Sequence, residues 1–186
     1  MFIVLEGIDG CGKSTQARLL AEWLEKEGHK VFLTAEPSKS RIGLFIKEIL
    51  SGKVKVDPKT LALLFTADRC EHLEKEIAPA LSCGRIVVCE RYYHSTVAYQ
   101  SAQGVESEWL FYINRFALKP DLVLFIDVKA DVALDRKDGK DIFEDKDFLG
   151  KVYKKYQRFA TMKKIDGCRR YDEVFEDIKA AVSALL

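Results

Sequence analysis

Eight residues that follow a short apolar run have the types and spacing of a phosphate-binding loop. The run is Phe2–Leu5, and it leads through Glu6 into Gly7-Ile8-Asp9-Gly10-Cys11-Gly12-Lys13-Ser14, which matches G-x-x-x-x-G-K-[ST]. The glycines let backbone N–H groups turn toward a phosphate, and the helix expected from Thr15 adds a partial positive charge. Lys13 would reach the β- and γ-phosphates, and the Ser14 hydroxyl could bind Mg²⁺. We therefore expect residues 7–14, with Thr15, to bind a nucleoside triphosphate.

This loop alone leaves the reaction open, because hydrolases, motors, switches and kinases share it. A switch GTPase would show a guanine-reading Asn-Lys-x-Asp segment after its fourth strand. The corresponding strand candidate, Leu122–Val128, instead continues as Lys129-Ala130-Asp131-Val132. The sequence therefore disfavours a switch GTPase.

Two further pairs of residues could contact a second substrate. Phe65 and Arg69 are four residues apart in a helical segment, so a ring and a guanidinium project from one face. Phe65 could equally be a core residue. Glu90 and Arg91 follow the apolar run Ile86–Cys89, where an acid suits Mg²⁺ and an arginine suits a phosphate. Taken alone, this pair could also be a surface ion pair.

The elements that position these residues alternate between short apolar runs and segments of helix length. The strand candidates are Phe2–Leu5, Val31–Thr34, Ile86–Cys89, Leu122–Asp127 and, more weakly, Met162–Ile165. Apolar runs without alternation suit strands buried on both faces, and the intervening helices call for right-handed crossovers. The sequence thus predicts a three-layer α/β/α P-loop fold with a five-stranded parallel sheet. Ligands bind beyond the carboxyl ends of such strands.

Composition excludes several other classes of protein. The 186 residues carry a formal net charge of +1, which argues against nucleic acid or an acidic membrane as a partner. The longest apolar runs fall far short of the roughly 20 residues of a membrane-spanning helix, and the start resembles no secretory signal, so we expect a cytoplasmic protein. Five scattered cysteines and three histidines suggest reduced thiols rather than disulfides or a metal cluster.

Short segments along nearly the whole chain resemble the thymidylate kinase family, whose members phosphorylate dTMP with ATP. In order, they are Leu5-Glu6-Gly7-Ile8-Asp9-Gly10, Thr34-Ala35-Glu36-Pro37, Ile42-Gly43, Phe65-Thr66-Ala67-Asp68-Arg69, Glu90-Arg91-Tyr92, Ser95-Thr96-Val97-Ala98-Tyr99-Gln100, Lys119-Pro120-Asp121-Leu122 and Leu124-Phe125-Ile126-Asp127-Val128. The resemblance implies a single domain over 1–186, a small lid at about 136–147 and a homodimer.

The resemblance also implies a dTMP site. Phe65 would stack on thymine, and Arg69 would donate to its O4 edge. Arg91, with Arg41, would hold the dTMP phosphate, while Asp9 would accept from the sugar 3′-hydroxyl. The remaining dTMP residues would be Glu36, Ser95, Thr96, Tyr99 and Gln100.

Catalysis in this family is a matter of placing two phosphates in line and neutralising their charge. The resemblance gives this role to Lys13, Asp9, Glu90, Arg91 and Arg136, with Mg²⁺ held by Ser14 and Glu90, partly through water. Further lid cations would be Lys137 and Lys140, although this segment could be only a solvated loop. The acceptor phosphate is already anionic and needs no general base, so we interpret His72 and His94 as ordinary helix or surface residues.

Four positions depart from the family pattern. Ala35, Lys47 and Ile142 stand where arginines are usual, and Glu90 replaces the commoner aspartate. Two alternatives stay open. One is a kinase for another nucleoside monophosphate such as dUMP, which lacks only the 5-methyl group. The other is a nucleotide-binding sensor that transfers phosphate poorly.

Overall fold

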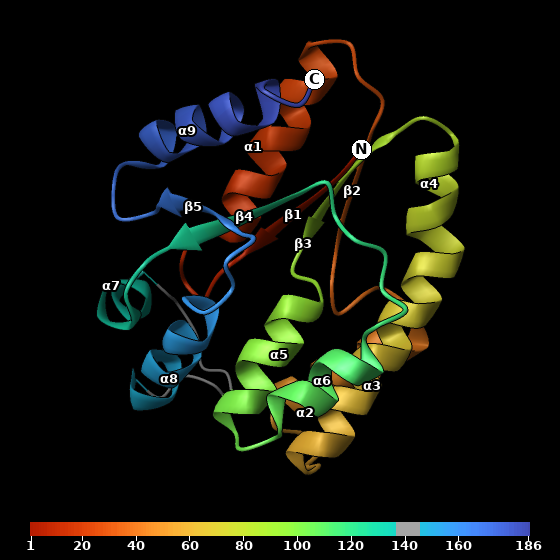
Figure 1. The fold of residues 1–186 in the computed structure, drawn as a ribbon, viewed down its shortest axis with the longest axis vertical. Coiled ribbons are helices and arrows are strands. Elements are labelled where there is room, and N and C mark those ends of the chain that lie inside the picture. Colours follow the sequence, from red (N-terminus) through yellow and green to blue (C-terminus); the bar gives the residue numbers. More distant parts are fainter. Residues whose placement is uncertain (137–145) are drawn as a thin grey trace.

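Five strands form one parallel sheet, in the order β2-β3-β1-β4-β5, within a computed structural model that describes residues 1–136 and 146–186 (Figure 1). The strands are β1 (Phe2–Glu6), β2 (Val31–Ala35), β3 (Ile86–Glu90), β4 (Leu122–Asp127) and β5 (Lys163–Asp166). All four neighbouring pairs are parallel. The sheet confirms the predicted P-loop α/β fold and all five strand candidates.

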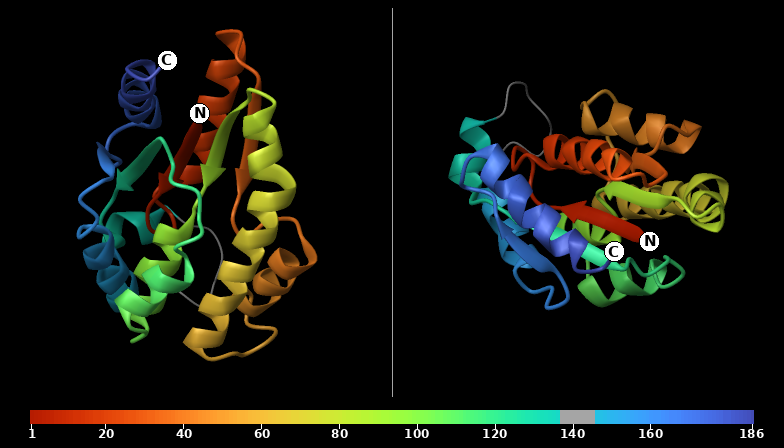
Figure 2. Two further views of the ribbon diagram at one scale, coloured as in Figure 1. Left: turned by 45° about the vertical axis from the view of Figure 1, so that its right-hand side comes forward. Right: turned by 90° about the horizontal axis from the view of Figure 1, so that it is seen from above.

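Helices surround this sheet (Figure 2). They are α1 (Lys13–Lys26), α2 (Arg41–Leu50), α3 (Pro58–His72), α4 (Ala78–Ser82), α5 (Tyr93–Ala102), α6 (Ser107–Ile113), α7 (Ala130–Asp135), α8 (Lys146–Tyr156) and α9 (Tyr171–Ser183), with a π-helical turn, η1 (Leu73–Ile77), between α3 and α4. None of those in the described part of the chain combines the length and apolarity needed to cross a bilayer.

The core lies around the central strands. Every residue of β1 is buried, as are the first four residues of β3, whereas the edge strands β2 and β5 are more open. Helix α1 contributes Ala17, Leu20 and Leu24 to this core. Burial on both faces explains why the central strands have unbroken apolar sequences.

The sheet brings its functional segments together at the carboxyl ends of the strands. Strand β1 leads into the phosphate loop, and its Leu5 pairs with Glu90 at the end of β3. Ala35, at the end of β2, pairs with Glu90 from the other side. Both chain termini lie at the opposite end of the molecule (Figure 1). Side chains that follow β1, β2 and β3 can therefore meet around one site.

Candidate functional site

The phosphate loop has the backbone shape that its glycines predict. Gly10 has φ +79°, and a Cβ atom there would lie 2.0 Å from the Ala133 carbonyl oxygen, so no other residue fits without strain. The Lys13 Nζ donates to the Ile8 carbonyl at 2.8 Å, and the residue is only 4% exposed. No side chain of the described residues caps α1, which leaves its first N–H groups available to an anion. The loop is thus built to enclose a phosphate beside an ammonium group.

The two predicted metal ligands are adjacent at the edge of this loop. The Ser14 Oγ donates to Glu90 Oε1 at 2.9 Å. Hydroxyl and carboxylate oxygens are hard ligands that suit Mg²⁺, which usually takes one or two protein ligands together with water and substrate phosphates. Within residues 1–136 and 146–186, no group of three or more His, Cys, Asp or Glu residues could form a dedicated metal site. The residues present therefore fit a magnesium ion that arrives with a nucleotide.

Arg91 is turned toward the phosphate loop by an unusual backbone conformation. Its φ of +66° makes it the only residue other than glycine with positive φ in the described chain, and its N–H donates to the Leu5 carbonyl at 2.9 Å. The guanidinium contacts Asp9 Oδ1 at 2.5 Å and the Gly7 carbonyl at 3.3 Å. Burial lowers the pKa of Arg91, but the Asp9 carboxylate, together with Tyr99, Tyr156 and Glu6, raises it overall. The partner of Arg91 is therefore Asp9 rather than Glu90.

Tyr99 completes this contact from α5. Its hydroxyl donates to Asp9 Oδ2 at 2.9 Å, and the Asp9 N–H donates to the same hydroxyl at 3.1 Å. The Tyr99 ring also lies 5.2 Å from the Arg91 guanidinium. Burial raises the pKa of Tyr99 far above its usual value, so it remains a neutral phenol. Asp9 thus belongs to the phosphate loop and to the neighbouring pocket at once.

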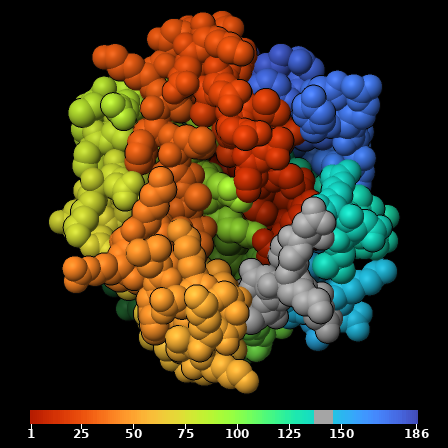
Figure 3. Space-filling model, turned by 180° about the vertical axis from the view of Figure 1, so that it is seen from behind, coloured from red at the N-terminus to blue at the C-terminus, as the bar shows by residue number. Residues whose placement is uncertain are grey.

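This pocket gathers nearly all the residues that the resemblance assigns to the second substrate. It has about 480 Å³ of empty space, part of which is open to solvent. Seen from behind, it lies in the hollow where green atoms from around residue 95 are visible between orange and red segments (Figure 3). The lining residues are Asp9, Glu36, Pro37, Leu50, Phe65, Arg69, Arg91, Tyr92, Ser95, Thr96, Tyr99 and Gln100.

Arg41 is the exception, because it does not line this pocket. The Ser40 Oγ accepts from the Gly43 N–H and thereby caps α2, so Arg41 becomes the first residue of that helix. Its side chain is exposed and lines a separate charged groove with Glu71 and Lys75. The structure does not bring Arg41 to the acceptor pocket.

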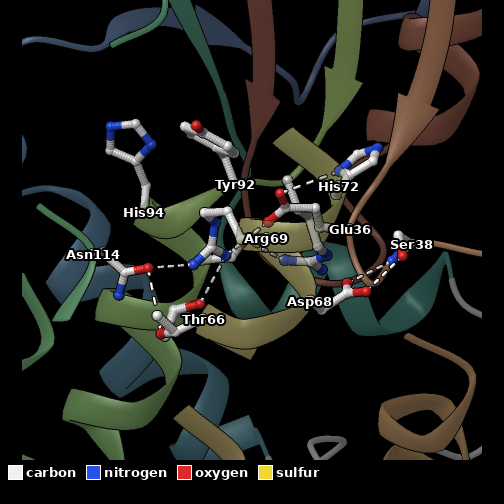
Figure 4. Close-up of polar contacts among 12 residues, drawn as sticks. Glu36, Ser38, Thr66, Asp68, Arg69, His72, Tyr92, His94 and Asn114 are labelled. Carbon is white, nitrogen blue, oxygen red and sulfur yellow. Dashed lines mark hydrogen bonds and ion pairs between the residues drawn. The ribbon is translucent and has the colours of Figure 1, made fainter. Parts of the chain in front are cut away.

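Arg69 is held deep in the pocket wall by groups from three different elements (Figure 4). Its Nη1 donates to Asn114 Oδ1 at 2.5 Å, and its Nη2 donates to Thr96 Oγ1 at 3.1 Å and lies 2.7 Å from Glu36 Oε2. Among the described residues, the Arg69 Nε and the Gln100 Oε1 are buried without a hydrogen-bond partner. Two residues lining the pocket therefore retain one unused donor and one unused acceptor.

Glu6 is a functional candidate that the sequence reasoning missed. It is fully buried and accepts from the Tyr92 N–H at 2.8 Å, the Ser95 Oγ at 2.7 Å and the Tyr156 hydroxyl at 2.8 Å. Burial raises the pKa of Glu6, but His94, Ser95 and the charge of Arg91 together lower it overall. Glu6 thus anchors the turn that carries Arg91. In the sequence, the feature that could have pointed to Glu6 was an acidic residue at the end of an otherwise apolar strand.

The two histidines interpreted as ordinary helix or surface residues do lie on helices, but both are buried beside a carboxylate. His94 is 1% exposed, with its Nδ1 3.7 Å from Glu6 Oε1. His72 is also 1% exposed, with its Nδ1 3.4 Å from Glu36 Oε1. A surface role is therefore wrong for both.

A second pocket lies on the other side of the phosphate loop. It has about 750 Å³ of empty space, part of which is open to solvent, and is lined by Gly10, Cys11, Gly12, Thr15, Gln16, Arg136, Gly167, Arg169, Tyr171 and Val174. The Arg136 Nη1 donates to the Gly167 carbonyl at 2.9 Å, which holds this side chain against the loop after β5. This pocket can take the part of a nucleotide that extends beyond its phosphates. The lid candidates Lys137 and Lys140 lie outside the described residues.

The positions that lack the family arginines have other surroundings. Lys47 donates from Nζ to the Ser38 carbonyl at 2.9 Å and so supports the turn after Glu36. Ala35 ends β2, and its methyl side chain cannot make the charged contact that an arginine would make. Ile142 lies outside the described residues.

Comparisons with known proteins agree with this geometry. The family model described as thymidylate kinase matches residues 5–178. A protein of Thermococcus onnurineus named "Probable thymidylate kinase" is 41% identical, over 98% of this chain and 97% of its own length. A Methanocaldococcus jannaschii protein of the same name is 54% identical, over 86% of this chain and 81% of its own. By sequence, by fold and by the residues around its two pockets, the chain belongs to the thymidylate kinase family.

Proposed function

We propose that this protein transfers the γ-phosphoryl group of ATP to dTMP, giving dTDP and ADP. One observation carries the proposal: nine residues expected to contact dTMP line a single pocket, and Asp9 joins that pocket to the phosphate loop. Two nucleotides, one on each side of Asp9 and Arg91, would direct their phosphates toward each other.

The reaction needs placement and charge neutralisation more than proton transfer. An anionic oxygen of the dTMP phosphate forms a bond to the γ-phosphorus, while the bond from that phosphorus to the β–γ bridging oxygen breaks and ADP leaves. Lys13 would neutralise the donor phosphates, and Arg91 would hold the acceptor phosphate. When bound by Ser14 and Glu90, Mg²⁺ would neutralise further charge on the phosphate oxygens. Arg136 would act on the donor nucleotide from the second pocket.

The pocket supports a pyrimidine base as the acceptor. Phe65 offers an aromatic face, which is worth about 1–3 kcal/mol per stacked base. The unused donor of Arg69 and the unused acceptor of Gln100 suit the O4 carbonyl and N3–H of thymine. Tyr99, 5% exposed and bonded to Asp9, would lie beside the sugar. A uracil base satisfies the same groups and lacks only a methyl contact, so weaker activity on dUMP is expected.

Apolar side chains on three helices support a homodimer. Leu44 on α2, Leu63 on α3, and Phe111 and Tyr112 on α6 are between 46% and 59% exposed. Large exposed apolar surfaces on a folded domain often form protein interfaces. Sedimentation of the purified chain would test the dimer. A cytoplasmic location remains a prediction from the sequence.

A coupled assay of ADP release tests the proposed reaction. The purified chain receives ATP and Mg²⁺ with dTMP, dUMP, dCMP, dGMP, AMP or UMP in separate reactions, and Lys13→Ala serves as the inactive control. A clear preference for dTMP, lost when Mg²⁺ is omitted, is the expected result. ATP binding without stimulation by any acceptor would overturn the proposal in favour of a sensor, and a preference for another monophosphate would replace the substrate.

A further inference from the structure

We infer that His72 is a positioning residue for base recognition: it orients Glu36, and Glu36 in turn fixes the Arg69 guanidinium in the pocket wall. This inference rests on the proposed function only in taking thymine as the base that Arg69 recognises. The chain of contacts itself is a property of the ligand-free protein.

The contacts form one buried line that crosses from β2 to α3 (Figure 4). The His72 Nε2 lies 2.7 Å from the Thr34 Oγ1, and its Nδ1 lies 3.4 Å from Glu36 Oε1. The other carboxylate oxygen, Oε2, lies 2.7 Å from the Arg69 Nη2. His72, Glu36 and Arg69 are each no more than 4% exposed. Water is thus largely excluded from these contacts.

The chemistry of the groups assigns the proton on His72. An ionised carboxylate carries no proton to donate, so the contact with Glu36 requires the hydrogen to be on Nδ1. The Thr34 hydroxyl can donate to an unprotonated Nε2 or accept from a protonated one. Thr34 lies in the sheet opposite Cys89, so its position is set by the backbone. The imidazole ring is therefore held from one side and presents a donor to Glu36 on the other.

Glu36 depends on this donor. The described residues offer its Oε1 no other hydrogen-bond partner, and its backbone N–H is already bonded to the Glu90 carbonyl at 2.9 Å. A buried carboxylate oxygen without a partner carries a large desolvation cost, so the side chain would turn toward the open pocket. Arg69 would then lose its ion pair, since no other carboxylate of the described residues pairs with it.

His72 acts at a distance from the ligand. It is absent from the residues that line the acceptor pocket, whereas Glu36 and Arg69 both line it. The guanidinium is also held by Asn114 and Thr96, so loss of Glu36 would leave it bound but free to tilt. A tilted guanidinium donates less well to a carbonyl at position 4 of the base. His72 should therefore affect the affinity and selectivity for dTMP far more than ATP binding or transfer.

Three substitutions of His72 separate its two contacts. In His72→Asn, the side-chain NH₂ stands in for Nδ1 and restores the donor to Glu36. In His72→Gln, the NH₂ stands in for Nε2 and restores only the contact with Thr34. His72→Ala removes both, and Thr34→Val removes the Nε2 contact while leaving the ring in place. Each variant is compared with the unmodified chain for thermal melting, dTMP dissociation constant, KM for ATP, and preference for dTMP over 5-methyl-dCMP.

We expect His72→Ala and His72→Gln to weaken dTMP binding about tenfold, as the loss of one hydrogen bond to a charged group would. Their preference for dTMP over 5-methyl-dCMP, which has an amino group at position 4, should fall by a similar factor. His72→Asn and Thr34→Val should stay within about twofold of the unmodified chain. The KM for ATP should be unchanged throughout. Equal losses in His72→Asn and His72→Gln, or parallel losses for ATP and dTMP, would overturn the inference.

A measurement without any ligand keeps this test separate from the proposed function. Nitrogen-15 NMR of the free protein near neutral pH should show a proton on Nδ1 of His72, and in His72→Asn the Arg69 Nε–H signal should keep its position. A proton on Nε2 alone would contradict the inference even in an active kinase. Failure of the unmodified chain to bind dTMP would instead count against the proposed function. If His72→Ala does not fold, the comparison of His72→Asn with His72→Gln remains decisive.

Discussion

Substitution of Phe65 by alanine tests whether this residue stacks on the base or belongs to the core. The ring lines the acceptor pocket and is half-buried, packed at the edge of the main core. Loss of a stacked base costs about 1–3 kcal/mol, which corresponds to a dTMP affinity about 5- to 150-fold weaker. A fully buried phenylalanine would instead cost about 3–5 kcal/mol of folding free energy when truncated. Because Phe65 is only partly buried, Phe65→Ala should lose less folding free energy than that range.

The assay is steady-state ADP release with dTMP and ATP varied separately, together with thermal melting. We expect the KM for dTMP to rise within the stated range, the KM for ATP to stay within about twofold, and the melting temperature to fall by less than about 10 °C. Phe65→Tyr keeps the ring and should keep the affinity. Leu64→Ala is a matched control, because Leu64 is also half-buried against the core but does not line the pocket. An unchanged KM for dTMP, or equal increases for both substrates, would refute the stacking role.

Four further outcomes follow from single contacts. Lys13→Ala should abolish transfer without a change in the circular dichroism spectrum, and an active variant would remove the phosphate-loop argument. Gly10→Ala places a Cβ 2.0 Å from a backbone oxygen, so ATP should bind about tenfold more weakly while dTMP binding by calorimetry changes little. Arg41→Ala should leave the KM for dTMP within about twofold, since exposed substitutions away from a site change little. The folded pKa of Glu6 lies below its ordinary value of 4.5. The stability that ionised Glu6 contributes is therefore complete above that pH and is lost as the pH falls through the folded pKa. In urea unfolding, the unmodified chain should lose more stability between pH 7 and pH 4 than Glu6→Gln, and parallel losses would contradict this.

The strands were predictable because the sheet buries its central members on both faces. Each apolar run in the sequence lies within one residue of an observed strand, as Phe2–Leu5 does within β1. Helix ends were less certain. The helix after the phosphate loop begins at Lys13 rather than Thr15. Apolar residues at helical spacing, Ile178, Val182 and Leu185, continue past the end of α9 at Ser183. Leu185 is 48% exposed. Spacing records which residues share a face, but not where the backbone stops being helical.

The site was predictable where function depends on local spacing and unpredictable where it depends on distant pairs. Phe65 and Arg69 were expected on one helix face, and both line the pocket. The pairing of Arg91 with Asp9 depends on a left-handed backbone conformation that no residue type at position 91 signals. Glu6 and His94 come together across 88 positions of sequence through the parallel crossover of β1 and β3. No periodic pattern encodes such a meeting.

We expect the contacts of Asp9 to couple the binding of the two nucleotides thermodynamically. Its backbone N–H and one carboxylate oxygen engage Tyr99, and the other oxygen engages Arg91, so a molecule that displaces either partner also acts on the loop that encloses the donor phosphates. Linkage between two sites is reciprocal, so the factor by which one substrate changes the affinity of the other is the same in both directions. Until an acceptor anion competes for it, the Arg91 guanidinium stays paired with Asp9 of the phosphate loop.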